Sequence, residues 1–389
     1  MKLSKRILNI NPSATLELSN RVSELRAQGV DIISYNVGEP DFFTPENIRE
    51  AGKRAIDEGK TTYTPVAGIP ELRRMISEKL QNDNNITYSP QEICLGVGAK
   101  QPLLNAVLAV CDDGTEVIIP TPCWVSYIEM VKLAGATPVL VPCKEEDGFE
   151  LDMAAIEAAV TERTSAVLIN TPNNPTGAVY SEGTLRKLAS LAVERDFVVI
   201  ADEIYEKLIY NGKKHFSIAS ISPEVREHVV TINGFSKAYA MTGWRMGYTA
   251  APAPITAQML KLHQFAIMCA PTTSQFAAVE ALKNGDEDIA MMTAQYDARR
   301  RFLVDGLRKI GIPCFEPEGA FYVFPNVGVF GMTSEEFCER LLYEGRVAIV
   351  PGNAFGDCGE GFARISYAYS LRHITEALER IEAFVKTLK

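Results

Sequence analysis

The sequence of 389 residues predicts an α/β fold built on a seven-stranded, mostly parallel sheet between helices. Short apolar runs recur through the middle of the chain, and helical stretches separate several of them. Five of these runs are apolar without interruption, as expected of strands that are buried on both faces. Strands that alternate with helices pair in parallel, and the helices between them cover the sheet. These observations therefore predict one mostly parallel sheet covered by helices.

Seven segments are predicted as strands of this sheet: residues 93–98, 116–120, 138–142, 166–170, 197–201, 229–233 and 246–250. Between them lie four predicted helices, at residues 101–110, 125–134, 153–161 and 182–195. Ser181 is expected to cap the last of these helices, because a serine hydroxyl accepts a hydrogen bond from the first helical turn.

The pattern changes after residue 272. Residues 272–311 show long helical periodicity with many charges, residues 321–325 and 363–369 are strand-like, and residues 374–386 are predicted to form a closing helix. We therefore expect a large domain at residues 48–285. Residues 1–47 should form an N-terminal arm and part of a smaller α+β domain, which residues 286–389 complete.

Composition restricts the function. The formal net charge is -10 and no run of Lys and Arg exceeds three residues, which argues against nucleic acid or an anionic membrane as a partner. No apolar stretch approaches the roughly 18 residues of a membrane span, and the first residues lack the pattern of a signal peptide. We expect a cytoplasmic enzyme that acts on small molecules.

Metal chemistry is not expected. The eight cysteines include no C-x-x-C pair, and none of the four histidines stands at i, i+4 spacing to another. In a cytosolic chain the thiols are expected to stay reduced.

Polar residues follow five of the predicted strands. Each of the five is followed within a few residues by one of these groups: Ala99 and Lys100, Trp124, an Asn-Pro turn at residues 173–177, Asp202 with Tyr205, and Lys237. The carboxyl ends of parallel strands meet at one edge, where ligands of such sheets bind. Each residue taken alone has a simpler interpretation: Asp202 as a helix cap, residues 173–177 as a turn, Trp124 as core and Lys237 as solvated surface.

Glycines at the first strand end do not complete a nucleotide motif. Gly96-Val97-Gly98 lacks the third glycine of a dinucleotide fingerprint, and the segment through Lys100 lacks the spacing of a P-loop. A nucleotide-binding oxidoreductase is therefore disfavoured. A glycine turn that leads into a helix can still bind a phosphate through free backbone N–H groups.

With these motifs the sequence resembles the class I aminotransferases of PLP fold type I, and within them the bacterial aspartate aminotransferase branch. The resemblance covers nearly the whole chain. It rests on Lys237 with Arg245 eight positions later, Asn174-Pro175-Thr176-Gly177, Asp202-Glu203-Ile204-Tyr205, Pro12-Ser13-Ala14-Thr15, Gly38-Glu39-Pro40-Asp41-Phe42, Tyr63-Thr64-Pro65-Val66-Ala67-Gly68, Cys123-Trp124-Val125-Ser126-Tyr127 and Arg364-Ile365-Ser366-Tyr367-Ala368.

The resemblance implies a homodimer with shared active sites and pyridoxal 5′-phosphate as cofactor. Lys237 would hold the cofactor as a Schiff base and move the proton at the substrate Cα. Asp202 would pair with the ring nitrogen, Asn174 and Tyr205 would donate to the ring oxygen, and Trp124 would stack on the ring.

For the phosphate, the resemblance implies Arg245, the backbone of Ala99 and Lys100, and Tyr63 from the second subunit. Many relatives carry a serine three residues before the lysine. This chain has Gly234 there, and Ser236 is the candidate that replaces it.

Arg364 would bind the substrate α-carboxylate bidentately, together with Asn174 and the backbone of Gly38. Lys100, with Thr15 nearby, corresponds to a lysine that contacts a distal carboxylate, which favours aspartate, glutamate and 2-oxoglutarate as substrates. Lys100 as a solvated residue at a helix start is the alternative. Relatives that use prephenate tend to carry a basic residue at the position of Asn11, so this chain departs from them.

The resemblance predicts ping-pong transamination between an amino acid and a 2-oxo acid. Transamination of aromatic amino acids or prephenate, and β-elimination at a carbon–sulfur bond, are alternatives on the same residues. A non-catalytic sensor of this fold is disfavoured, because the chain has no additional DNA-binding segment and its catalytic set is complete.

Overall fold

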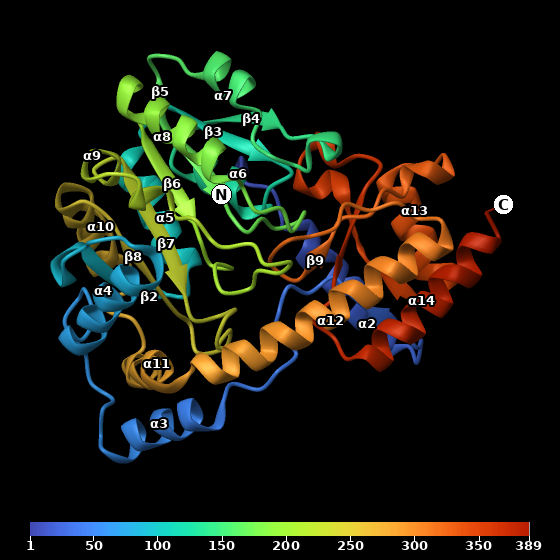
Figure 1. The fold of residues 1–389 in the computed structure, drawn as a ribbon, viewed down its shortest axis with the longest axis horizontal. Coiled ribbons are helices and arrows are strands. Elements are labelled where there is room, and N and C mark those ends of the chain that lie inside the picture. Colours follow the sequence, from blue (N-terminus) through green and yellow to red (C-terminus); the bar gives the residue numbers. More distant parts are fainter. Residues whose placement is uncertain (389) are drawn as a thin grey trace.

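The computed structural model describes residues 1–388 and contains the predicted seven-stranded sheet, in the order β2-β8-β7-β6-β5-β3-β4 (Figure 1). The strands are β2 (Ile93–Val97), β3 (Glu116–Thr121), β4 (Thr137–Pro142), β5 (Thr164–Asn170), β6 (Val198–Asp202), β7 (Val229–Gly234) and β8 (Met246–Ala250). All seven predictions are confirmed to within two residues. Only β8 runs antiparallel to its neighbours, because residues 235–245 are too few for a helical crossover from β7.

Helices cover both faces of the sheet, because successive strand residues point to opposite sides. Val167 and Ile169 of β5 pack into one apolar cluster, whereas Ala166 and Leu168 pack into another. The first cluster contains residues of α4 (Pro70–Asn84), α7 (Met153–Ala159), α8 (Glu182–Arg195) and α11 (Thr272–Asn284). The second contains residues of α5 (Lys100–Val110), α6 (Ser126–Leu133) and α10 (Ala253–Ala266). Both faces of the sheet are therefore buried.

The four helices predicted between the strands begin and end within two residues of the predicted positions. The Ser181 hydroxyl accepts a hydrogen bond from the N–H of Thr184 at 3.2 Å, which confirms the predicted cap of α8. The periodic region at 272–311 is divided at Gly285 into α11 and the long helix α12 (Asp286–Ile310). A further helix, α3 (Glu46–Asp57), packs against α11 at the bottom of Figure 1.

The C-terminal third forms a third apolar cluster together with part of the N-terminal segment. It contains α12, α13 (Ser334–Arg340) and α14 (Leu371–Lys386), and a small sheet of β11 (Val350–Pro351), β12 (Ala363–Ser366) and β9 (Tyr322–Val323). The strands predicted at 321–325 and 363–369 are shorter than expected. The domain bounds stay a prediction.

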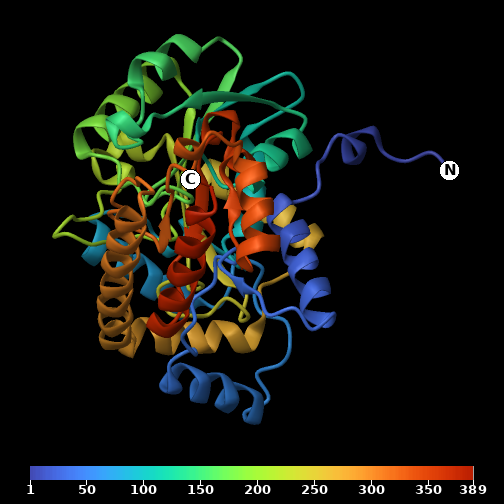
Figure 2. The ribbon, with the colours of Figure 1, turned by 90° about the vertical axis from the view of Figure 1, so that its right-hand side faces the viewer.

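The N-terminal segment is tied to this part by β1 (Ile33–Ser34), which pairs in parallel with β10 (Val347–Ala348). This segment begins with α1 (Lys5–Leu8) and α2 (Ala14–Ala27). The remaining short helix, α9 (Pro223–Arg226), lies elsewhere in the chain, just before β7. Figure 2 shows the first residues extending away from the rest of the molecule. Within residues 1–388 no helix has the length and apolar character that crossing a membrane requires.

Candidate active site

A cavity of about 370 Å³ lies where the carboxyl ends of the central strands meet the C-terminal part. Twelve of the predicted site residues line it: Thr15, Gly38, Ala99, Lys100, Trp124, Asn174, Asp202, Tyr205, Ser236, Lys237, Arg245 and Arg364. Tyr63 does not; its side chain is 82% exposed on the surface of this chain.

Lys237 follows β7 and points into this cavity. Its Nζ donates to the carbonyl oxygen of Gly38 at 2.6 Å, and it lies 5.5 Å from the ring centre of Phe321. The pKa of Lys237 is lowered to about 8, mainly by burial and also by Arg364 and Arg245, while Glu39 and Asp202 oppose this shift. About a tenth of this amine is therefore unprotonated at pH 7, far more than for a solvated lysine.

Asp202 ends β6 and is buried. Its Oδ2 accepts a hydrogen bond from the Tyr127 hydroxyl at 2.7 Å, and its Oδ1 accepts one from the N–H of Ile204 at 3.2 Å. Burial raises the pKa of Asp202 to about 6, although the hydrogen bonds from Tyr127 and Ile204 favour the charged form. This carboxylate is thus ionised at pH 7 and has no cationic side chain bound to it.

Arg364 on β12 is buried beside the predicted amide. Its Nη1 donates to Oδ1 of Asn174 at 3.1 Å and its Nη2 donates to the carbonyl oxygen of Asn36 at 2.7 Å, whereas its buried Nε has no partner. The guanidinium also lies over the ring of Tyr322, 4.7 Å from the centre. A fixed cation with an unused donor is suited to bind a carboxylate.

A second cationic corner is formed where β2 runs into α5. Gly98 has a φ of +63°, and a Cβ added there would lie 2.4 Å from Nη2 of Arg245. The Arg245 Nη1 donates to the carbonyl oxygen of Thr242 at 2.9 Å. Because α5 begins at Lys100 without a capping side chain, its N-terminus and Arg245 together can bind an anion. Ser236 is buried and lines the same cavity.

The remaining predicted residues surround the space between these groups. Trp124 is half-buried, and the Lys100 Nζ lies 4.6 Å from the centre of its ring. Lys100 is exposed to solvent, yet it lines this cavity and an adjoining, largely apolar cavity of about 580 Å³. The smaller cavity is the candidate site, because the buried Asp202 and Lys237 line it.

Among the lining residues that were not predicted, two tyrosines contact predicted site residues: Tyr127 and Tyr322. Tyr127 lies in the first turn of α6, three positions after Trp124, and both belong to the segment Cys123-Trp124-Val125-Ser126-Tyr127 that carries the resemblance, so this segment was a usable signal. Tyr322 comes from the two-residue strand β9 and carries no such signal. Its hydroxyl lies 2.9 Å from that of Tyr205.

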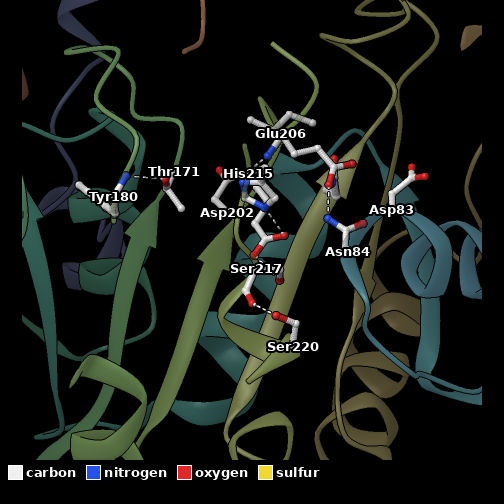
Figure 3. Close-up of polar contacts among 12 residues, drawn as sticks. Asp83, Asn84, Thr171, Tyr180, Asp202, Glu206, His215, Ser217 and Ser220 are labelled. Atoms are coloured by element: carbon white, nitrogen blue, oxygen red, sulfur yellow. Dashed lines mark hydrogen bonds and ion pairs between the residues drawn. The ribbon is translucent and has the colours of Figure 1, made fainter. Parts of the chain in front are cut away.

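Close to Asp202 lies an ionic cluster that includes Glu206 and His215 (Figure 3). Within residues 1–388 it is the one group of metal-ligand type, with ligand atoms of Glu203, Glu206 and His215 all within 4.8 Å of one another. Lys79 and Asn84 of α4 donate to the two oxygens of Glu206. These donors occupy Glu206, so the cluster serves to support the turn at residues 203–206.

Burial alone would lower the pKa of His215, but the Glu203 carboxylate, 2.9 Å from its Nε2, and Glu206 outweigh burial and raise it. The Ser217 hydroxyl donates to the other oxygen of Glu203 at 2.7 Å. The turn that follows Asp202 and carries Tyr205 is therefore stabilised by the interaction of His215 with the carboxylates of Glu203 and Glu206.

The fold and the cavity together define a class: an α/β enzyme with a half-buried lysine of lowered pKa, a buried carboxylate and two cationic corners for an anionic ligand. Comparison with known proteins makes this specific. Residues 30–381 match the family model of aminotransferase class I and II.

Relatives span the full chain. An aspartate aminotransferase of Pyrococcus abyssi is 44% identical over 100% of both chains, and an aromatic-amino-acid aminotransferase of Thermococcus litoralis is 42% identical over 100% of both. The structure of the aspartate aminotransferase of Thermus thermophilus with maleate is 43% identical, with a TM-score of 0.95 over 99% of this chain and 100% of that chain. The protein belongs to the class I and II aminotransferases, and its fold and enzyme class are those the sequence predicted.

Proposed function

We propose that this aminotransferase uses pyridoxal 5′-phosphate, held by Lys237, and that it moves the amino group of aspartate or glutamate to a 2-oxo acid. The observation that carries the proposal is that Lys237, Asp202 and Arg364 line one cavity. An amine, an acid and a carboxylate receptor are the three groups this reaction needs from the protein.

The cavity fits this cofactor. The α5 N-terminus with Arg245 suits the phosphate, and the buried carboxylate of Asp202 suits a protonated ring nitrogen. The half-buried Trp124 offers an aromatic face, and Asn174 and Tyr205 offer donors. When bound, pyridoxal phosphate supplies an electron-withdrawing ring that accepts the electron pair released at the substrate Cα.

The chain's own residues provide the remaining steps. Arg364 holds the α-carboxylate and so orients the substrate Cα toward Lys237. The Lys237 amine, whose pKa is lowered to about 8, would take the proton from the substrate Cα and return it to C4′ of the bound cofactor. Asp202 keeps its charge beside the ring nitrogen, because Tyr127 and the Ile204 N–H stabilise the carboxylate.

For the substrate side chain we propose that Lys100, with Thr15, binds a distal carboxylate. Both residues line the cavity, and the Lys100 ammonium lies over the ring of Trp124, which also lines it. The similarity to an aspartate aminotransferase solved with the dicarboxylate maleate supports this choice. The equally long match to an aromatic-amino-acid enzyme makes tyrosine the competing substrate.

We also propose a cytoplasmic homodimer. Tyr63 is 82% exposed and lies outside its own chain's cavity, as expected if it completes the phosphate site of a second copy.

The test is a steady-state assay of the purified protein, loaded with pyridoxal phosphate, on aspartate plus 2-oxoglutarate. We expect oxaloacetate and glutamate to form, and Lys237→Ala to abolish their formation. Tyrosine, prephenate and cystathionine are run in parallel. Release of pyruvate from cystathionine without amino transfer would contradict the proposal.

The distal-carboxylate assignment has its own test. Lys100→Ala should lower kcat/KM for aspartate roughly tenfold or more while changing that for tyrosine little, because a charge-assisted bond is worth about 1.5 to 3 kcal/mol. The exposed Lys187, altered in the same way, is the matched control. An equal loss for both substrates would refute the assignment.

A further inference from the structure

Tyr322 lies among three residues of the proposed site that come from separate parts of the chain. Its side chain is almost fully buried, with 1% of the residue exposed, and it lines the cavity. Its hydroxyl is 2.9 Å from that of Tyr205, and its ring lies under the guanidinium of Arg364 at 4.7 Å. A Cβ added at Gly38 would lie 2.1 Å from the Tyr322 hydroxyl.

The direction of the bond between the two hydroxyls follows from counting protons. Each phenol has one proton to donate. Under the proposed function Tyr205 donates its proton to the ring oxygen of the cofactor, so the shared bond is formed only if Tyr322 donates to Tyr205.

The charges around the pair favour the same direction. Burial raises the pKa of Tyr322, and the guanidinium of Arg364 opposes this rise. Burial raises the pKa of Tyr205 much further, and Tyr322 adds to that rise, although Arg364 opposes it here too. The phenol beside the guanidinium is therefore the more acidic of the two, and the more acidic phenol is the better donor.

We propose that Tyr322 is a positioning residue that donates to the Tyr205 hydroxyl, and so fixes Tyr205 as a hydrogen-bond donor to the cofactor's ring oxygen. The ring of Tyr322 also packs against the guanidinium of Arg364. Tyr322 therefore contacts both Arg364, which binds the substrate carboxylate, and Tyr205, which binds the cofactor's ring oxygen. The inference rests on the proposed function.

A chain of two hydrogen bonds polarises its middle member, which strengthens the bond that Tyr205 makes. Removing the Tyr322 hydroxyl should therefore destabilise the anionic ring oxygen. A neutral hydrogen bond corresponds to a change of roughly two- to tenfold in an equilibrium constant, and this is the expected change in the acid dissociation constant of the bound cofactor.

The experiment is a pH titration of the visible absorbance of the cofactor-loaded protein. Tyr322→Phe should move the titration midpoint to higher pH, by a factor of about two to ten in the dissociation constant. In the Tyr205→Phe background the same substitution should add no shift. Tyr367→Phe is the matched control: this buried hydroxyl donates to the carbonyl oxygen of Ala320 at 3.1 Å and does not line the cavity.

If Tyr322→Phe fails to fold, 3-fluorotyrosine at position 322 replaces it, since a more acidic phenol of the same shape should move the midpoint to lower pH. A midpoint unchanged by either replacement, or an equal shift in the Tyr205→Phe background, would overturn the inference alone. A native protein that binds pyridoxal phosphate without a pH-dependent visible band would overturn the proposed function first.

Discussion

Tyr127→Phe tests how the protein keeps Asp202 ionised in a buried place. The substitution removes one hydroxyl, which donates to the Asp202 carboxylate at 2.7 Å, and leaves the ring that packs edge-on against Trp124. A hydrogen bond to a charged group is worth about 1.5 to 3 kcal/mol. At 1.36 kcal/mol per pKa unit, losing it raises the pKa of Asp202 by roughly one to two units.

The starting pKa of Asp202 is about 6, so the substitution should move it to between roughly 7 and 8. At pH 7 the ionised fraction then falls from about nine-tenths to between about a half and a tenth. Since the carboxylate must be charged to pair with a protonated ring nitrogen, affinity for pyridoxal phosphate should fall roughly two- to tenfold at pH 7. The loss should vanish well above pH 8.

The assay is the affinity of the cofactor-free protein for pyridoxal phosphate, followed through Trp124 fluorescence between pH 5.5 and 9. Asp202→Asn provides the control for protons that the cofactor itself gains or loses. Tyr127→Phe should weaken binding in the native background and not in the Asp202→Asn background. The same loss in both backgrounds, or one that does not depend on pH, would refute the reasoning.

Three further substitutions follow from the same geometry. Arg364→Lys keeps a charge but loses the planar fork, so kcat/KM for amino and oxo acids should fall roughly ten- to a hundredfold at unchanged cofactor affinity; a weakened cofactor affinity in a binding titration would contradict this. His215→Asn removes a histidine whose pKa is raised by the neighbouring Glu203 carboxylate. A group with a raised pKa contributes its full stabilisation below its unfolded pKa, which is about 6.5 for histidine. This stabilisation is lost as the pH rises through the folded pKa. The loss of Tm should therefore be largest near pH 6 and shrink at higher pH, and a loss that grows with pH would exclude the ion pair. Gly38→Ala should lower the free energy of unfolding by about 1 to 3 kcal/mol in denaturant titrations, because the added Cβ meets the hydroxyl of Tyr322; unchanged stability would show that the ring moves aside freely.

The sheet and its functional edge could be predicted from the sequence because they depend on local patterns. Continuous apolar runs such as residues 166–170 and 197–201 have few interpretations other than buried strands. In a parallel sheet the residue after each run lies at a known edge, and this rule alone predicts that Asp202 and Lys237 lie close together.

The remaining contacts depend on how distant segments dock. Tyr127 reaches Asp202 at the end of β6 from α6, which follows β3, and the pairing of Tyr322 with Tyr205 joins the small sheet to the turn after β6. Strands of two residues, such as β9, have no period to detect. The helical pattern continues on both sides of Gly285, so it did not show that residues 272–311 form two helices.

The most direct test of the proposed chemistry is the site at which the cofactor is bound. The protein is loaded with pyridoxal phosphate, reduced with borohydride, digested and mapped by mass spectrometry. We predict that the label lies on Lys237 and that Lys100, the other lysine of the cavity, carries none. Label on another lysine, or full amino transfer by a Lys237→Ala protein, would contradict the central claim.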